Sequence, residues 1–257
     1  MKRFFQYFIF TATVCILYIL SSFRTRDSKV SIQSGMEFII HFNATINGER
    51  LTFRKKYSNS FNESFSVEKF KFYFGKGNLI AETTKREVPL EGDEYSLIDF
   101  KDSTLCTIRF HARPGKYNYL GFLLGVDSIR NTSGAQTGAL DPSKGMFWTW
   151  NSGYVMAKLE GTSPLSKQPA HAMEYHIGGF RSPYNTAREI KLKFPGETEM
   201  TSQRNCEVFI NVELNNWFDG PNPIHIAEIS TCTTPGELAK KISDNYERMF
   251  SITSIVN

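Results

Sequence analysis

Hydrophobic and polar residues alternate in many short runs along the chain, which is the pattern of a half-buried β-strand. In the first run, Phe38, Ile40 and Phe42 fall on one side of a strand and His41 falls on the other. The pair Asn47-Gly48 follows and is typical of a hairpin turn. Further strands are predicted at residues 50–58, 67–80, 94–100, 104–112, 117–127, 146–161, 173–180, 188–194 and 206–214.

The spacing between these runs predicts the fold class. Gly, Pro, Asn and Asp separate the strands, and no long helices alternate with them, so we expect an all-β chain folded as an antiparallel β-sandwich. One helix is predicted near the C-terminus, at residues 235–250. Thr234 is its expected N-cap, Pro235 its first helical residue and Glu237 the partner in a capping box. Its apolar residues recur at helical spacing, which indicates that one face packs on the sandwich.

The N-terminal residues differ from the rest of the chain. Basic residues at positions 2 and 3 precede about 20 residues without charge, and Arg24 and Arg26 follow them. We predict a signal peptide or signal anchor at residues 1–26, a linker at 27–35 and one domain at 36–257. The protein is therefore expected in the periplasm or cell envelope, with residues 4–23 as a membrane anchor where the segment is retained.

Charge argues against a nucleic-acid partner. The whole chain has a formal net charge of +4, but four basic and no acidic residues lie in the first 26 positions. The remaining chain holds 26 basic and 26 acidic residues. It lacks the positive charge on which nucleic-acid binding mainly depends.

Three cysteines follow the N-terminal segment, at Cys106, Cys206 and Cys232. One disulfide with a spare thiol and three unpaired cysteines are both compatible with this number in an exported protein. A Cys206–Cys232 bond is the preferred pairing, because it would tie one strand to the loop before the last helix. No cysteine spacing predicts a structural zinc site.

Motifs for catalysis are missing from the sequence. It contains no phosphate-binding GxxxxGK[ST] or GxGxxG, no GxSxG and no HExxH. A nucleophile, a base and an orienting group cannot be named, and we therefore predict that the protein is not an enzyme.

The five histidines are the first candidates for a site. His171 and His176 would face opposite sides of one strand, so they are not expected to chelate one ion together. His41 and His176 are either buried imidazoles with hydrogen-bonded nitrogens or metal ligands. Imidazoles near soft groups suit copper better than magnesium or calcium.

The paired tryptophans are the second candidate. Trp148 and Trp150 would project from the same face of a strand, directly after a long polar loop at residues 128–145. Loops of this length are often functional, so the two rings are either ordinary core packing or the wall of a crevice. The carboxylates of the loop make calcium a less favoured ligand, since they lack the spacing of an EF-hand.

Four segments resemble the MbnP-like family of secreted, copper-associated proteins. They are the first strand at residues 37–51, the long loop with the WTW run at 124–161, the EYHIGGF segment at 174–180 and the DNYERMF segment at 244–250. The resemblance covers roughly residues 36–252. It implies a bacterial envelope β-sandwich without established catalysis, in which histidines and kynurenine, an oxidised tryptophan, hold copper. A di-haem partner enzyme of the cytochrome c peroxidase type makes that oxidation in characterised relatives.

Carried over residue by residue, the resemblance implies that His41 and His176 bind copper, with Cu(I) favoured. It implies that Trp150, rather than Trp148, is oxidised to kynurenine. The function expected from it is copper handling. Some members have four cysteines, whereas the exported part of this chain has three. The alternative is a non-metal binding or adhesion module of the envelope, in which Trp148, Trp150 and Trp217 pack in the core or stack on sugars. Convergence of His41 and His176 would distinguish the two interpretations.

Overall fold

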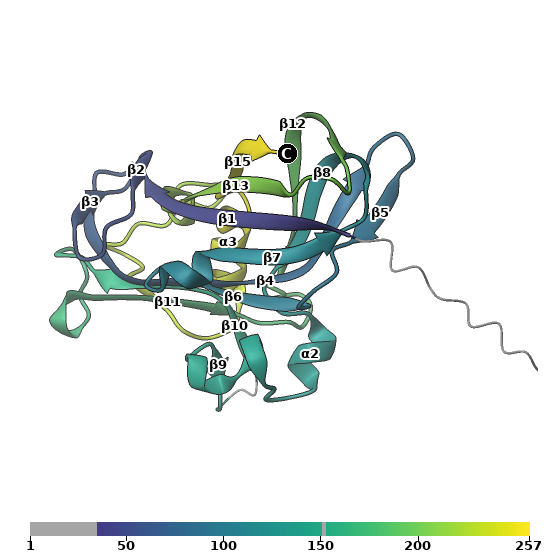
Figure 1. The fold of residues 1–257 in the computed structure, drawn as a ribbon. Helices are drawn as coiled ribbons and strands as arrows, with labels where there is room; N and C mark the ends of the chain where they lie inside the picture. Colours follow the sequence, from purple (N-terminus) through teal and green to yellow (C-terminus); the bar gives the residue numbers. More distant parts are fainter. Residues whose placement is uncertain (1–34, 151–152) are drawn as a thin grey trace, which may run out of the picture. The chain divides into compact units, whose positions relative to one another are not determined.

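Two β-sheets pack face to face in the computed structural model and enclose one large apolar core (Figure 1). The structure describes residues 35–150 and 153–257, and residues 35–257 form one compact unit. The predicted signal segment and nearly all of the predicted linker lie outside the described residues. Within the described part of the chain, no helix is long and apolar enough to cross a membrane.

The smaller sheet is centred on the first strand. It has the order β15-β13-β1-β2, and β7 also pairs with β1. The hairpin predicted at Asn47-Gly48 joins β1 to β2, with positive φ angles of 55° and 75°. The strands are β1 (Met36–Ile46), β2 (Glu49–Arg50), β7 (Thr107–Ala112), β13 (Cys206–Glu213) and β15 (Phe250–Val256).

The larger sheet has the order β12-β8-β4-β10-β11-β14. The 18-residue strand β4 also pairs with β3, β5 and β6, and β9 pairs with β10. The strands are β3 (Lys56–Ser58), β4 (Ser64–Ala81), β5 (Arg86–Pro89), β6 (Tyr95–Asp99), β8 (Gly115–Leu124), β9 (Phe147–Trp148), β10 (Gly153–Thr162), β11 (Ala172–Gly178), β12 (Arg188–Met200) and β14 (Thr231–Cys232).

The all-β sandwich is confirmed, with one correction to its strand directions. Most neighbouring strands are antiparallel, but β1 and β13 are parallel, and so are β11 and β14. The members of each parallel pair are distant in sequence, so no hairpin turn sets their relative direction. The predicted alternation is confirmed in β1, where Phe38, Ile40 and Phe42 are buried. Phe42 reaches the facing sheet, with its ring 5.5 Å from that of Phe72.

The C-terminal helix α3 (Glu237–Tyr246) is shorter than predicted and starts differently. Its N-cap is Gly236, at φ 153°, and the predicted capping box of Thr234 and Glu237 does not form. Glu237 instead pairs with Lys241 one turn later, at 2.8 Å. The chain from Phe250 onward is not helical but forms β15.

Helix α3 packs on the sandwich with one face, as predicted. Ala239, Ile242 and Tyr246 are buried, and the ring of Tyr246 lies 5.2 Å from that of Trp217. Trp217 belongs to the short 3₁₀ helix η5 (Leu214–Trp217) in the main core.

The preferred disulfide is wrong. Cys106, Cys206 and Cys232 are all free cysteines. Cys206 lies in β13 of the smaller sheet, whereas Cys232 lies in β14 at the edge of the larger sheet. Burial raises the pKa of both thiols to about 11.

Candidate ligand-binding site

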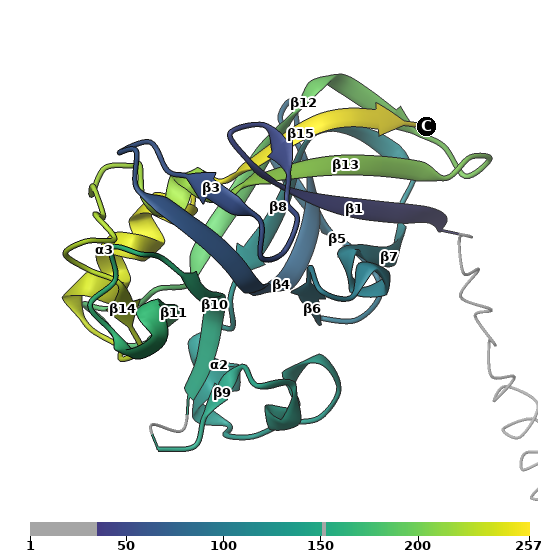
Figure 2. The same ribbon diagram turned by 90° about the vertical axis from the view of Figure 1, so that its left-hand side faces the viewer.

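The long polar loop folds into a lobe on the outer face of the larger sheet (Figure 2). It contains the short helix α2 (Ser128–Thr132) and the 3₁₀ helices η2 (Gly138–Leu140) and η3 (Pro142–Lys144), so it is more structured than the sequence predicted. A second apolar core joins lobe and sheet, with these buried members: Tyr73, Tyr95, Leu97, Val126, Leu140, Met146, Trp148, Tyr154, Val155 and Met156.

The two loop carboxylates considered for calcium act as helix caps. Asp127 accepts from the backbone N–H of Arg130 at 2.8 Å, and Asp141 accepts from that of Ser143 at 2.8 Å. Burial alone would raise the pKa of Asp127, but its bonds with Lys76, Arg130 and Tyr95 outweigh this effect and hold it at about 2. Asp127 is therefore a charged structural group of the lobe.

Asn131 fastens the lobe to strand β10. Its side-chain amide donates to the carbonyl oxygens of Val126 and Asp127 at 2.7 and 2.9 Å. Its side-chain oxygen accepts from the backbone N–H of Tyr154 at 2.8 Å. The amide is thus fully used, and it fixes the end of α2 relative to the sheet.

The predicted strand at residues 146–161 is a hairpin of β9 and β10, with Trp148 opposite Gly153. Trp148 is 7% exposed in the second core, whereas Trp150, in the turn after β9, is 63% exposed. Their rings still touch, with centroids 5.4 Å apart and planes inclined at 40°. The two tryptophans therefore lie together as expected, although they do not share the face of one strand.

A cavity of about 460 Å³ lies beside Trp148, and we call it the Trp148 pocket. Its walls come from segments far apart in sequence: the α2 end of the lobe, the β9–β10 hairpin, the loop after β11 and Pro235, which precedes the N-cap of α3. The aromatic residues are Trp148, Phe180 and Tyr184. The other lining residues are Asn131, Thr132, Gly134, Gly153, Gly179, Arg181, Ser182 and Pro235.

The pocket carries one charged side chain. The guanidinium of Arg181 stands over the ring of Phe180, with its central carbon 5.2 Å from the ring centroid. Among the described residues of the lining there is no aspartate, glutamate, lysine, histidine or cysteine. The pocket therefore combines flat apolar walls with a single positive charge.

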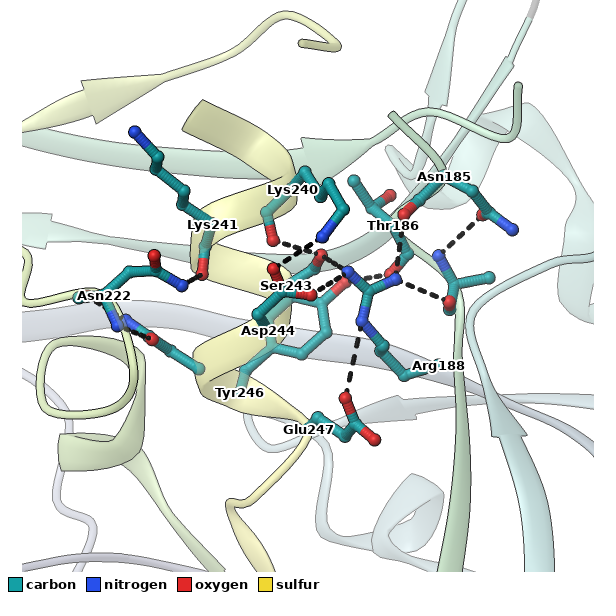
Figure 3. A network of polar contacts seen from close by, with 12 residues as sticks. Asn185, Thr186, Arg188, Asn222, Lys240, Lys241, Ser243, Asp244, Tyr246 and Glu247 are labelled. Carbon is teal, nitrogen blue, oxygen red and sulfur yellow. Dashed lines mark hydrogen bonds and ion pairs between the residues drawn. The ribbon is translucent and has the colours of Figure 1, made fainter. Parts of the chain in front are cut away.

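The pocket loop, residues 179–187, is held in place by helix α3 (Figure 3). The hydroxyl of Tyr246 donates to the carbonyl of Thr186 at 2.7 Å, and the N–H of Thr186 donates to the carbonyl of Gly179 at 2.9 Å. Arg188 donates to the carbonyl of Asn185 at 2.8 Å and to the carboxylate of Asp244 at 2.5 Å. These bonds close the loop at both ends.

The charged groups of this network stabilise one another electrostatically. Burial opposes ionisation of Asp244, but hydrogen bonds from Lys240 and Arg188 prevail and lower its pKa below the usual value. Arg188 also lies 3.6 Å from Glu247, and its side chain is only 13% exposed. Helical spacing predicted that Tyr246 lies on the buried face of this helix, but no pattern in the sequence indicated its bond to Thr186 or the ion pairs of Arg188 with Asp244 and Glu247.

His41 lies on the outer face of the smaller sheet. Its Nε2 is 2.8 Å from the carboxylate of Glu207, and its Nδ1 is 3.1 Å from the hydroxyl of Thr107. The imidazole stacks on Phe209, with centroids 4.5 Å apart. Both ring nitrogens are thus already hydrogen-bonded.

His176 lies on the outer face of the larger sheet. Its Nε2 is 2.9 Å from the carboxylate of Glu160, which also pairs with Lys69 at 2.6 Å. The hydrogen bond with His176, together with Lys69, outweighs burial and lowers the pKa of Glu160 to about 2. This cluster is a network of ion pairs on the sheet surface.

The structure does not bring His41 and His176 together. Facing sheets lie about 10 Å apart, whereas a bound transition-metal ion lies about 2 Å from each ligand nitrogen. Since the two imidazoles point outward from opposite sheets, they cannot bind one copper ion in a single molecule, and the expected ligand pair is corrected here. Within residues 35–150 and 153–257, no three His, Cys, Asp or Glu side chains are grouped closely enough to hold a metal ion. The described residues therefore do not fit the expected copper centre.

The sequence pattern indicated two walls of the pocket but not the wall formed by the loop after β11. The paired tryptophans and the long loop pointed to a crevice. Phe180, Arg181 and Tyr184 were not singled out, because an irregular loop carries no periodic pattern. Trp217 is a core residue, 1% exposed, so the sugar-stacking role considered for it is wrong.

Comparison with known proteins places the chain in a family. The family model described as MbnP matches residues 36–234, well over half of the chain. Among solved structures, the fold is similar to that of MbnP from Methylosinus trichosporium, with 14% sequence identity, a TM-score of 0.52 and coverage of 71% of this chain and 77% of that chain. No curated protein matches the chain. At this identity the structural likeness supports the fold alone, while the match of the family model shows that the chain belongs to the MbnP family.

Proposed function

We propose that this protein is an exported binding module, not an enzyme, that takes a small ring-containing organic ligand in the Trp148 pocket. The observation that carries the proposal is the pocket itself. Its volume of about 460 Å³ falls within the range of small-molecule sites, and aromatic side chains form much of its wall. Flat rings such as Trp148 bind ring-shaped ligands by stacking and by apolar burial.

The pocket is preformed, which favours binding over a structural accident. Asn131 fixes the lobe wall, and the Arg188 and Tyr246 bonds fix the loop wall. A ligand would therefore pay little ordering entropy on binding. The described residues of the lining offer aromatic, amide, hydroxyl and guanidinium groups, which are the groups that orient a bound small molecule.

Binding to the full chain can be tested with 2-naphthamide and methyl β-glucoside, a neutral aromatic ring and a neutral sugar ring. We expect at least one of them to show saturation-transfer NMR signals. The signals should be lost in Ser182→Trp, whose larger side chain fills the pocket. Ser202→Trp is the matched control, because Ser202 is also exposed but does not line the pocket. Equal loss in both variants would reject the proposal, and so would failure of both probes together with their carboxylate analogues, 2-naphthoate and methyl β-glucuronide.

A second candidate function follows from Trp150. We propose that this side chain is the substrate of an oxidising partner, such as the di-haem enzyme that the family resemblance implies. The supporting observation is that Trp150 is 63% exposed while it touches Trp148. An accessible indole in contact with a second indole is well placed to give up electrons to a docked enzyme. Copper is not part of this proposal, because the described residues do not fit the expected centre.

Intact-mass measurement after co-expression with a di-haem partner tests the oxidation. Conversion of tryptophan to kynurenine replaces one carbon by one oxygen, and peptide mapping then locates the change. We expect it at Trp150 and expect its loss in Trp150→Phe but not in Trp217→Phe. An unmodified chain after co-expression would contradict the assignment.

A further inference from the structure

We propose that the Trp148 pocket selects ligands that carry a carboxylate on or beside a ring with an apolar face, and that Arg181 is the residue that binds the carboxylate. This inference rests on the proposed binding function and names the class of ligand. The ligand class is inferred from the positive charge and the unpaired N–H donors of Arg181, not from the shape of the pocket.

Arg181 differs from the neighbouring arginine in the same part of the fold. Arg188 is mostly buried and shared between Asp244 and Glu247. The guanidinium of Arg181 is exposed at the pocket wall, and it has no ion pair or side-chain hydrogen bond within the described residues. Its planar fork of N–H donors is therefore free to bind a carboxylate through two parallel hydrogen bonds.

Two features favour Arg181 as a recognition group. The cation–π contact with Phe180, itself a lining residue, restrains the guanidinium and lowers the entropy lost when a ligand binds. The lining includes no acidic side chain that would compete for the charge or repel an anion. An anionic group is the ligand feature that this lining complements.

The aromatic walls determine the rest of the ligand. Tyr184, which is 42% exposed, offers the larger ring surface to a ligand, whereas the mostly buried Trp148 contributes a smaller part. A carboxylate on a ring bound here lies in the pocket that Arg181 also lines. Aromatic acids and uronic-acid sugars share this chemistry, since both combine an apolar ring face with a carboxylate. The experiment therefore has one arm for each source.

The test compares charged and neutral probes of the same shape on the full chain. The aromatic arm uses 2-naphthoate and 2-naphthamide, and the sugar arm uses methyl β-glucuronide and methyl β-glucoside. In at least one arm we expect the acid to bind about five- to tenfold more tightly than its neutral partner, as for a partly solvated charged hydrogen bond. The arm in which the preference appears identifies the source.

Two arginine variants assign the preference. Arg181→Gln should remove the preference for the acid, so that the acid and its neutral partner bind with equal affinity. Arg204→Gln, an equal change of charge at an exposed arginine outside the pocket, should keep the preference. If both variants lost the preference for the acid equally, the acid would be attracted by the overall positive charge of the protein, and the inference would be overturned.

The two proposals fail in different ways. Equal binding of acid and neutral probe in both arms overturns the role of Arg181 and leaves the binding function standing. Absence of binding by all four probes rejects the binding function, and the ligand class falls with it.

Discussion

At the scale of single residues, Gly178 determines how closely Trp148 approaches the larger sheet. A Cβ atom at this position would come within 2.6 Å of the Trp148 ring and 2.7 Å of the carbonyl oxygen of Tyr154. Both distances are shorter than any normal contact, and one of the atoms is backbone, which cannot turn away. The wall of the Trp148 pocket therefore depends on a residue without a side chain.

Gly178→Ala should destabilise the protein by about 1–3 kcal/mol, as overpacking does in other cores. Urea unfolding measures the change. Gly196→Ala is the control, because a Cβ there meets nothing within 4 Å, and its effect should stay within about 0.5 kcal/mol. Equal stability of the two variants would mean that Trp148 does not rest on Gly178.

Glu160 makes stability depend on pH in a defined range. Its pKa is about 2 in the folded state and about 4.5 without the fold, so the unfolded state binds more protons between these values. The stabilisation is present above pH 4.5 and is lost as the pH falls toward 2.

In Glu160→Gln we expect a loss of about 1 kcal/mol at pH 7, since solvent screens part of the cluster. We also expect a weaker pH dependence of the melting temperature between pH 5 and 2. If the melting temperature of Glu160→Gln changed with pH as much as that of the unaltered protein, the role of Glu160 would be contradicted.

At the scale of elements, the sequence predicted what periodicity can encode. The alternation in β1 and the Asn47-Gly48 hairpin formed as predicted, because both depend on local side-chain chemistry. Helix α3 formed, but its capping box did not, since Gly236 starts the helix and Glu237 pairs with Lys241. The parallel pairing of β1 with β13 is set by tertiary contacts that no local pattern shows.

Arg188 couples helix α3 to the pocket loop. Arg188→Gln removes the cation that pairs with Glu247 and leaves Asp244 with Lys240 alone, and we expect a loss of about 1–3 kcal/mol because the guanidinium is mostly buried. The same variant should weaken binding of 2-naphthamide, since the loop that carries Phe180 and Tyr184 loses its anchor.

The matched control for this prediction is Arg109→Gln. Arg109 pairs with Glu37 at 2.9 Å on the surface, where its side chain is 60% exposed. Exposed pairs contribute about 0–1 kcal/mol, so this variant should retain both stability and binding. Thermal unfolding and the saturation-transfer titration would show whether the ion pairs of Arg188 contribute more to stability and to binding than the exposed pair of Arg109 and Glu37.

At the scale of the whole molecule, the two sheets separate residues that the sequence alone grouped together. His41 and His176 were expected to share a copper ion, but each projects outward from a different sheet and is paired with a glutamate. In the Trp148 pocket, by contrast, the fold brings together segments between positions 131 and 235 that share no sequence motif. The alternation of residues in a strand predicts the face of the sheet on which a side chain lies. It does not predict which residues distant in sequence contact that side chain.

Anaerobic titration with Cu(I) against a competing chelator tests this separation. We expect the protein and the His41→Ala, His176→Ala double variant to retain the same amount of copper. One equivalent of Cu(I) that is held by the unaltered protein and lost in either single variant would show that the two imidazoles act together.

The central claim is that ligands bind beside Trp148, and the three tryptophans allow a direct measurement. In a protein with ¹⁵N-labelled indoles, Trp148 lines the pocket, Trp150 contacts its ring, and Trp217 is buried in the main core as an internal reference. Titration with 2-naphthoate should shift the Trp148 indole signal, with a smaller shift of Trp150 and none of Trp217. An unmoved Trp148 signal at a concentration where the probe is bound would contradict the account.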